Sequence, residues 1–236
     1  MVNAANPSAE RLARYLTGDA TGDRADELAA WIASSPRFRA FADAHRDKIR
    51  KKLRGATDDD AWRDVRAELA VAHRLLRERR LDLTFEPAGG QRGGPDFRVT
   101  FRDHLAFNLE VTRPRRDPDV TTIGRVMLAK LRQLPPGTAN VLLVALDASV
   151  VAADVIGAAA QGLRSLADAR DAALLERGAF ASPRDFYQRY LRLGAVVTWA
   201  TGAPEGIATS AWVNPSARIA VPGPALRACL AALGAD

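Results

Sequence analysis

The chain contains one cysteine, only four lysines and no hydrophobic run long enough for a membrane span. With Cys229 alone, an internal disulfide and any cysteine-based metal cluster are excluded. A membrane-spanning helix needs about 20 consecutive apolar residues, and the apolar runs here are much shorter. The first residues also lack the basic segment and apolar run of a secretory signal. These absences predict a cytoplasmic protein with no membrane association.

The chain of 236 residues is long enough for one domain with an appendage, and its hydrophobic content of 47% is ordinary for a globular protein. Its formal charge of +6 and pI of about 10.1 favour an anionic partner such as nucleic acid. GC-rich coding can by itself produce an arginine- and alanine-rich composition, so the clustering of the basic residues is more informative. They gather in three runs, at residues 46–54, 74–80 and 113–116.

The pattern of apolar residues predicts alternating helices and strands. Helices are expected over residues 8–17, 23–34, 37–54, 60–79, 119–134, 150–177 and 183–192, and from 223 onward. Strands are expected over 81–85, 97–101, 105–112, 140–146, 195–200 and 211–214. This order is typical of an α/β fold, a mixed sheet flanked by helices on both faces. Residues 1–55 are expected to form a helical N-terminal appendage, and residues 56–236 the α/β domain.

The most informative segment is the predicted hairpin around Asp103. Apolar and polar residues alternate strictly on both sides of Arg102-Asp103-His104, which has the composition of a turn. If the two strands pair symmetrically about Asp103, Asp96 and Glu110 lie opposite each other with their Cβ atoms about 4.5–5.5 Å apart. Like charges directly opposite are destabilising unless a cation bridges them. The pair therefore predicts a site for Mg²⁺ or Mn²⁺, which prefer hard oxygen ligands. The alternative is that both carboxylates are simply solvated.

Three more polar residues stand at the edges of apolar helical stripes. Glu68 lies one turn from Val65 and Ala72 in the helix expected before the first strand. Lys130 borders the stripe of the helix after the hairpin, and Gln133 follows three residues later on the same face. The other three lysines cluster at Lys48, Lys51 and Lys52, so an isolated lysine is unusual in this arginine-rich chain. Lysine also differs chemically from arginine, because its ammonium is a compact point charge.

With these residues in place, residues 60–146 resemble the PD-(D/E)xK nuclease superfamily, which includes many restriction enzymes. The resemblance rests on Glu68, on Pro95-Asp96, on Glu110-Val111-Thr112, and on the helix, hairpin, helix and strand that carry them. It implies a restriction-endonuclease-like fold and a nuclease that uses Mg²⁺ or Mn²⁺. By position, Asp96 and Glu110 would be the metal ligands and Glu68 an auxiliary acid.

The chain departs from the superfamily motif at Thr112, where a lysine is expected. One interpretation is that the lysine has moved to the next helix, so that Lys130 supplies the ammonium with Gln133 beside it. The other is that catalysis has been lost and a protein that binds nucleic acid or a protein partner remains. We favour the first interpretation, because both acids and an unusual lysine are retained.

The expected reaction is hydrolysis of phosphodiester bonds, in DNA rather than RNA. A metal lowers the pKa of a bound water, and the metal and a lysine can together stabilise the charge that develops on the phosphate oxygens. The basic run Arg113, Arg115 and Arg116 directly follows the acidic site, where a phosphate backbone would lie. The N-terminal helices could form a homodimer or recruit a protein partner.

Overall fold

The structure, a computed structural model, describes residues 7–18, 22–87, 94–115, 118–147, 150–200 and 209–234. By the contacts that its residues make, the chain divides into two compact units, Met1–Arg79 and Arg80–Asp236. The sequence-based division, at residues 55 and 56, assigns the helix before the first strand to the α/β domain. In the structure, the contacts of that helix group it with the helices that precede it.

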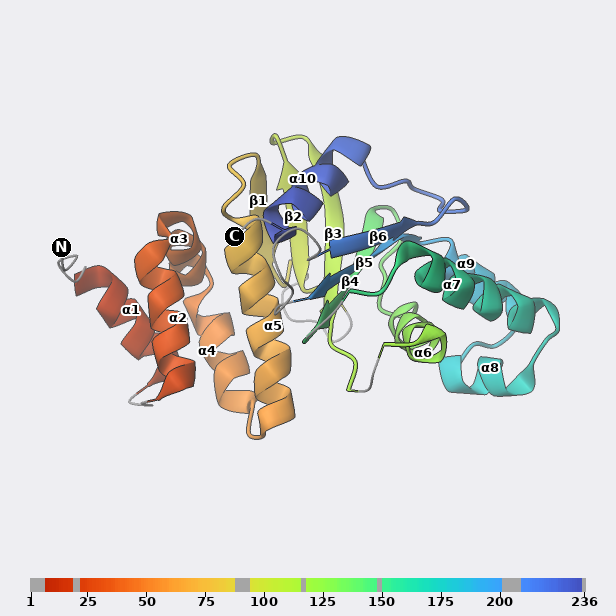
Figure 1. Cartoon of the computed structure of the whole chain (residues 1–236), viewed down its shortest axis with the longest axis horizontal. Coiled ribbons are helices and arrows are strands. Elements are labelled where there is room, and N and C mark those ends of the chain that lie inside the picture. Colours follow the sequence, from red (N-terminus) through yellow and green to blue (C-terminus); the bar gives the residue numbers. More distant parts are fainter. Residues whose placement is uncertain are drawn as a thin grey trace. The chain divides into compact units, whose positions relative to one another are not determined.

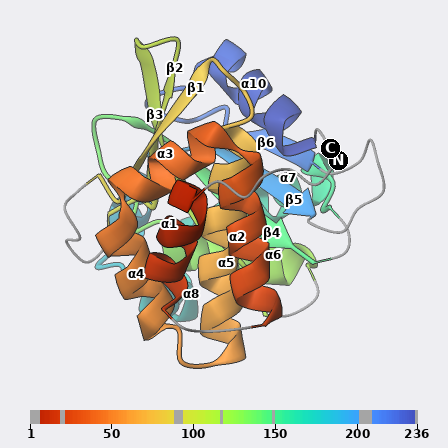
Figure 2. The same ribbon diagram turned by 90° about the vertical axis from the view of Figure 1, so that its left-hand side faces the viewer.

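The first unit is helical. It contains α1 (Pro7–Thr17), α2 (Asp23–Ser34), α3 (Pro36–Ala44), α4 (Arg46–Gly55) and α5 (Asp59–Leu75), as Figures 1 and 2 show. Two of these helices begin at side-chain caps, because Ser35 Oγ accepts a hydrogen bond from Phe38 N and Asp58 Oδ1 accepts one from Ala61 N. Large apolar side chains from all five helices are buried in this unit, among them Leu16, Ile32, Phe38, Ile49 and Leu75.

Two helices of this unit differ from the sequence prediction. The single helix expected over residues 37–54 is wrong, because His45 has φ −113° and ψ 16° and separates α3 from α4. The long helix α5 ends at Leu75, several residues before the expected end at residue 79. The apolar periodicity continues across both positions, so it could not reveal either boundary.

The second unit contains a sheet of six strands in chain order (Figure 1). These are β1 (Leu81–Phe85), β2 (Phe97–Phe101), β3 (Leu105–Thr112), β4 (Ala139–Leu146), β5 (Leu193–Ala200) and β6 (Thr209–Val213). The central strands β3, β4 and β5 run parallel, and the outer pairs are antiparallel. Both β4 and β5 are buried along their full length, as their apolar sequences predict. The α/β class with a mixed sheet is therefore confirmed.

Helices lie on both faces of this sheet. The helices α6 (Val120–Lys130), α7 (Ala153–Asp168), α8 (Ala172–Gly178) and α9 (Pro183–Tyr190) share one hydrophobic core with Leu142 and Val144 of β4. On the opposite face, the indole N–H of Trp199 donates to the carbonyl of Leu233 in α10 (Gly223–Gly234). Cys229 of α10 is buried, as predicted.

Two helices of the second unit are also shorter than expected. The helical stretch predicted over residues 150–177 is two helices, because Arg170 adopts a left-handed conformation with φ 55° between α7 and α8. The helix α6 ends at Lys130 and not at residue 134. Lys130 is thus the last residue of a helix, where a cation interacts favourably with the helix dipole.

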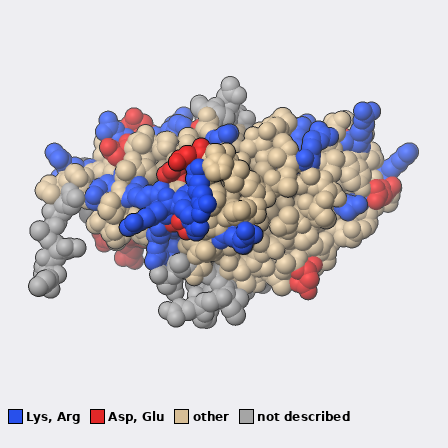
Figure 3. Space-filling model, turned by 90° about the horizontal axis from the view of Figure 1, so that it is seen from above, with Lys and Arg blue, Asp and Glu red and all other residues tan. Residues whose placement is uncertain are grey.

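The surface carries the basic charge of the chain. On the face shown in Figure 3, lysine and arginine side chains outnumber the acidic ones, in line with the formal charge of +6. Within the described ranges, no helix combines the length and the apolar character needed to cross a membrane.

Candidate active site

The predicted hairpin and its register are confirmed. In the structure, Phe97 pairs with Leu109, Val99 with Phe107 and Phe101 with Leu105, which is the pairing symmetric about Asp103. Arg102 and Asp103 have positive φ values of 49° and 64°, so the chain reverses within the expected three residues. The apolar set of the alternation faces a core, and its members in β2 are at most 3% exposed.

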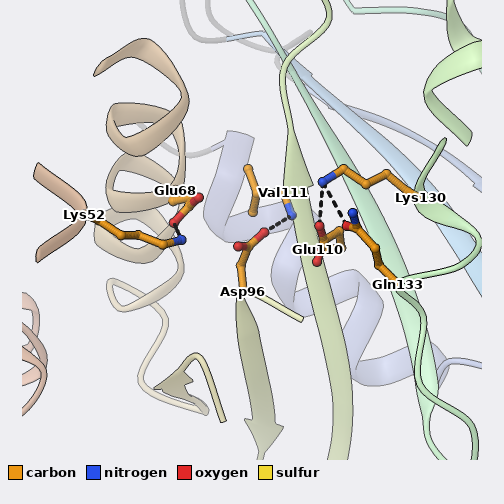
Figure 4. A network of polar contacts seen from close by, with 7 residues as sticks. All are labelled: Lys52, Glu68, Asp96, Glu110, Val111, Lys130 and Gln133. Carbon is orange, nitrogen blue, oxygen red and sulfur yellow. Dashed lines mark hydrogen bonds and ion pairs between the residues drawn. The ribbon is translucent and has the colours of Figure 1, made fainter. Parts of the chain in front are cut away.

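Asp96 lies directly before β2, and its position is fixed by hydrogen bonds on both sides. Its Oδ2 accepts a hydrogen bond of 2.8 Å from the backbone N–H of Val111 in β3, and its carbonyl accepts one of 2.8 Å from Glu86 N. Continued by one pair, the register of the hairpin places Asp96 opposite Glu110. The half-buried carboxylate of Asp96 is therefore held at the end of the β2–β3 ladder, next to the strand that carries Glu110 (Figure 4).

Glu110 is a buried acid in a central strand. It is 4% exposed, and it pairs in register with Leu142 of β4, whose side chain belongs to the core under α6–α9. Burial of an ionised carboxylate is costly unless a cation pairs with it. Here the ammonium of Lys130 donates to Glu110 Oε1 at 2.7 Å.

Lys130 reaches Glu110 because of the way α6 is anchored. Asp119 caps the start of the helix by accepting a hydrogen bond from Thr122 N, and the stripe residues Ile123 and Met127 are fully buried. At the end of the helix, Lys130 Nζ donates both to Glu110 Oε1 and, at 3.1 Å, to Gln133 Oε1 (Figure 4). The structure thus brings together Glu110, Lys130 and Gln133, the three residues that the sequence singled out on β3 and after it.

The side chains at this end of the hairpin include oxygen donors of the type that small divalent cations bind. Asp96 and Glu110 offer carboxylate oxygens from neighbouring strands, and Gln133 adds an amide oxygen close to Glu110. Oxygen ligands of this kind are those that Mg²⁺ and Mn²⁺ take in proteins. Across the described segments, no cluster of three or more histidine, cysteine or acidic side chains could hold a metal. The predicted metal site would therefore depend on the pair of acids Asp96 and Glu110.

Glu68 belongs to the helical unit. It lies half-buried in α5, and its carboxylate forms an ion pair with Lys52 of α4 (Figure 4). This pair links two helices of the same unit, and the role of Glu68 as an auxiliary acid stays a prediction.

Thr112 and part of the basic run that follows it lie within the described residues. Thr112, at the motif position where a lysine is expected, is the half-buried last residue of β3. Arg113 is half-buried and Arg115 is exposed, whereas Arg116 lies outside the described residues. Contact of this run with a phosphate backbone stays a prediction.

A buried amide pair beside the site was missed from the sequence. Asn108 Nδ2 donates to Asn140 Oδ1 at 3.0 Å, and these residues pair in register on β3 and β4. Asn140 is fully buried, and its Nδ2 also lies within 3.0 Å of three backbone carbonyls, those of Pro135, Thr138 and Arg192. The available signal was an asparagine at the head of an otherwise apolar strand. The pair fixes the start of β4 to the strand that carries Glu110.

No protein-family model, curated protein or solved structure matches this chain. The resemblance to the PD-(D/E)xK superfamily therefore rests on the residues and elements described above.

Proposed function

We propose that this protein is a divalent-metal-dependent nuclease that hydrolyses phosphodiester bonds in DNA. The observation that supports the proposal most is the 2.7 Å contact between Lys130 Nζ and Glu110 Oε1. A lysine from outside the short motif reaches the motif acid, which is what the relocation hypothesis requires. A lysine that served only for solubility would extend into solvent and would not contact a buried residue of a strand.

Each residue of the site has a role in this proposal. Asp96 and Glu110 would hold the cation, which would lower the pKa of the attacking water and neutralise charge on the phosphate. Lys130 places a second positive charge beside Glu110, where it can stabilise the charge that develops on the phosphate oxygens. Gln133 accepts a hydrogen bond from Lys130 Nζ and so keeps the ammonium in position. The bond from Val111 N orients the carboxylate of Asp96.

Two further parts of the proposal concern Glu68 and the basic run after β3. Glu68 would act as an auxiliary acid, as the resemblance implies. Arg113, Arg115 and Arg116 would contact the phosphate backbone next to the cleaved bond, because they directly follow β3 in the chain.

A cleavage assay tests the proposal. Plasmid, linear duplex, single-stranded DNA and RNA would be incubated with the protein in Mg²⁺, in Mn²⁺ and in EDTA. We expect products from DNA in either metal and none in EDTA, and we expect loss of the products in Glu110→Gln and Lys130→Met. Glu176→Gln is the matched control, because Glu176 is an exposed acid of α8 in the same unit. Equal cleavage by wild type and Glu110→Gln would refute the proposal.

A second candidate is a nucleic-acid-binding protein that no longer cleaves. It is favoured by Thr112 at the motif position and by the Lys130–Glu110 pair, which neutralises the buried acid without a metal. This candidate predicts binding whose affinity falls steeply with salt concentration, with no products on any substrate. Metal-dependent products that disappear in Glu110→Gln would exclude it.

A further inference from the structure

The helical unit contains a cavity of about 550 Å³ that the proposed function does not use. Ligand clefts in proteins commonly measure roughly 300–1,000 Å³, so the cavity has room for a nucleotide-sized group. Residues of α1, of α3 and of the start of α4 line it, among them Arg11, Tyr15, Arg39, Asp43 and Arg46. In Figure 2, α1 lies in front of α2 and α4, with α3 above them.

The charge that lines this cavity is mainly positive. Arg11 Nε donates to the carbonyl of Pro7 at 3.2 Å, and Arg39 Nη1 to that of Ile32 at 3.5 Å. Backbone carbonyls orient these two guanidinium groups without cancelling their charge. The one acid of the lining, Asp43, lies 3.5 Å from Arg46, and both side chains are more than half exposed. An ion pair this exposed contributes little, so Arg46 remains available to another anion.

Tyr15 contacts two guanidinium groups of α4, that of Arg46, which also lines the cavity, and that of Arg50. Its ring centroid lies 4.3 Å from the guanidinium carbon of Arg50 and 5.8 Å from that of Arg46. Its hydroxyl donates to Asp47 Oδ1, which fixes the ring relative to α4. Cation–π contacts of this kind help to hold arginine side chains in place.

The basic charge continues from the cavity along α4. This helix carries Arg46, Lys48, Arg50, Lys51, Lys52 and Arg54, with Asp47 as its single acid. Arg46 contacts Asp43 of α3, and Lys52 forms an ion pair with Glu68 of α5. A row of cations with so few acids matches a polyanion better than it matches a mixed protein surface.

We propose that the cavity between α1 and α3, together with α4, binds the phosphodiester backbone of a nucleic acid. Arginine favours phosphate as the ligand, because its planar fork donates two parallel hydrogen bonds to one phosphate group. This contact goes beyond the proposed catalytic function, since it requires neither a metal nor cleavage. It gives the helical unit a role in holding the substrate.

The test is a binding titration of the full chain in EDTA, where metal-dependent cleavage cannot occur. The anisotropy of a fluorescent DNA duplex would be followed between 50 and 200 mM salt for wild type and for the double variant Arg11→Ala with Arg46→Ala. The matched control is Arg63→Ala with Arg79→Ala, which removes the same charge from exposed positions of the same unit away from the cavity. Polyglutamate would be used as a competitor.

We expect the cavity variant to bind roughly tenfold or more weakly than wild type, and the slope of log affinity against log salt to fall by about one for each lost phosphate contact. The control should stay within about twofold, and polyglutamate should compete poorly. No binding by wild type, equal effects in the two double variants, or competition by polyglutamate as strong as by unlabelled DNA would each overturn the proposal. Because the assay contains no metal, its outcome is independent of whether Glu110→Gln abolishes cleavage.

Discussion

Among the described residues, a lysine–glutamate ion pair occurs in each of the two units, and these two pairs differ in their surroundings. In the helical unit, Lys52 and Glu68 join α4 to α5, with 25% and 14% of their side chains exposed. In the sheet unit, Lys130 and Glu110 join the end of α6 to a central strand, and the glutamate is only 5% exposed. In both pairs the ammonium contacts a carboxylate oxygen directly, so the contact alone does not indicate which pair marks a site.

The difference lies in what accompanies each pair. Glu110 stands in a strand whose register places Asp96 opposite it, and Lys130 has a second acceptor in Gln133. Glu68 has Lys52 on the next helix, an arrangement that also serves to hold two helices together. A second acid at the matching position of the neighbouring strand is therefore the feature that distinguishes a candidate metal site from a structural ion pair.

The largest expected effect is on cleavage. Glu110→Gln keeps the size of the side chain but removes the charge that would bind the cation, so we expect the cleavage rate to fall about 10²–10⁴-fold. Glu68→Gln removes the comparable charge from the helical unit and should lower the rate by about 10–100-fold at most, as for an auxiliary group. Single-turnover rates on a DNA duplex would measure both. A larger loss in Glu68→Gln than in Glu110→Gln would reverse the comparison.

The second effect is on stability. Lys130→Met leaves Glu110 buried without its ammonium, and we expect the free energy of unfolding to fall by roughly 2–4 kcal/mol. Lys52→Met removes the ammonium that pairs with Glu68, a less buried glutamate, and should lower the free energy of unfolding by about 1 kcal/mol. Urea denaturation at pH 7 measures both values. Similar losses in the two variants would mean that the two pairs are equivalent.

The amide pair beside Glu110 offers a third test, confined to the sheet unit. Asn140→Leu removes the donor to buried carbonyls and the acceptor for Asn108, so we expect a loss of roughly 2–3 kcal/mol in the free energy of unfolding. Asn214→Leu is a control of the same type, because Asn214 is also buried and donates to Leu193 O. Urea denaturation combined with the cleavage assay separates the two residues. We expect only Asn140→Leu to lower the cleavage rate of the remaining folded protein.

The smallest expected effect is a loss of stability at acidic pH that arises from a histidine of the helical unit. Burial, with smaller contributions from Arg74 and Arg77, lowers the pKa of His73 in the helical unit from 6.5 to about 4. The unfolded chain therefore takes up a proton below pH 6.5, whereas folded His73 does not until about pH 4. The stability that the neutral imidazole confers is present above pH 6.5 and is lost as the pH falls from 6.5 to 4, by roughly 1–3 kcal/mol.

His73→Phe should reduce this pH dependence and retain the ring contacts with Trp31 and Phe38. His45 provides a check, because burial and Lys48 lower its pKa as well, so a shallower slope should remain in the variant. Urea denaturation at several pH values between 7.5 and 4 measures the slope. An unchanged slope in His73→Phe would show that the acid response arises elsewhere.

The hairpin that carries the candidate site, and its register, were predicted correctly because local patterns determine them. Strict alternation and a three-residue turn determine the β2–β3 register, because a slip of one residue would expose Phe97 and Val99 to solvent. Lys130 stood out because lysine is rare in this chain and the residue borders an apolar stripe. In each case, the neighbours along the chain carried the information.

The structural features that the sequence did not predict depend mainly on contacts between segments that are far apart in the chain. The Asn108–Asn140 pair forms only after the α6 crossover brings β4 beside β3 in one particular register. The break at His45 interrupts a stretch whose apolar spacing is helical on both sides. The Lys52–Glu68 pair depends on the packing of α4 on α5, which periodicity alone cannot specify.

The most direct test of the proposed metal site is a calorimetric titration of Mn²⁺ into wild type, Glu110→Gln and Glu68→Gln. We expect binding by wild type, binding at least tenfold weaker in Glu110→Gln, and binding within a few-fold of wild type in Glu68→Gln. Equal affinities in wild type and Glu110→Gln, or no binding by wild type, would contradict the claim that Asp96 and Glu110 form a metal site.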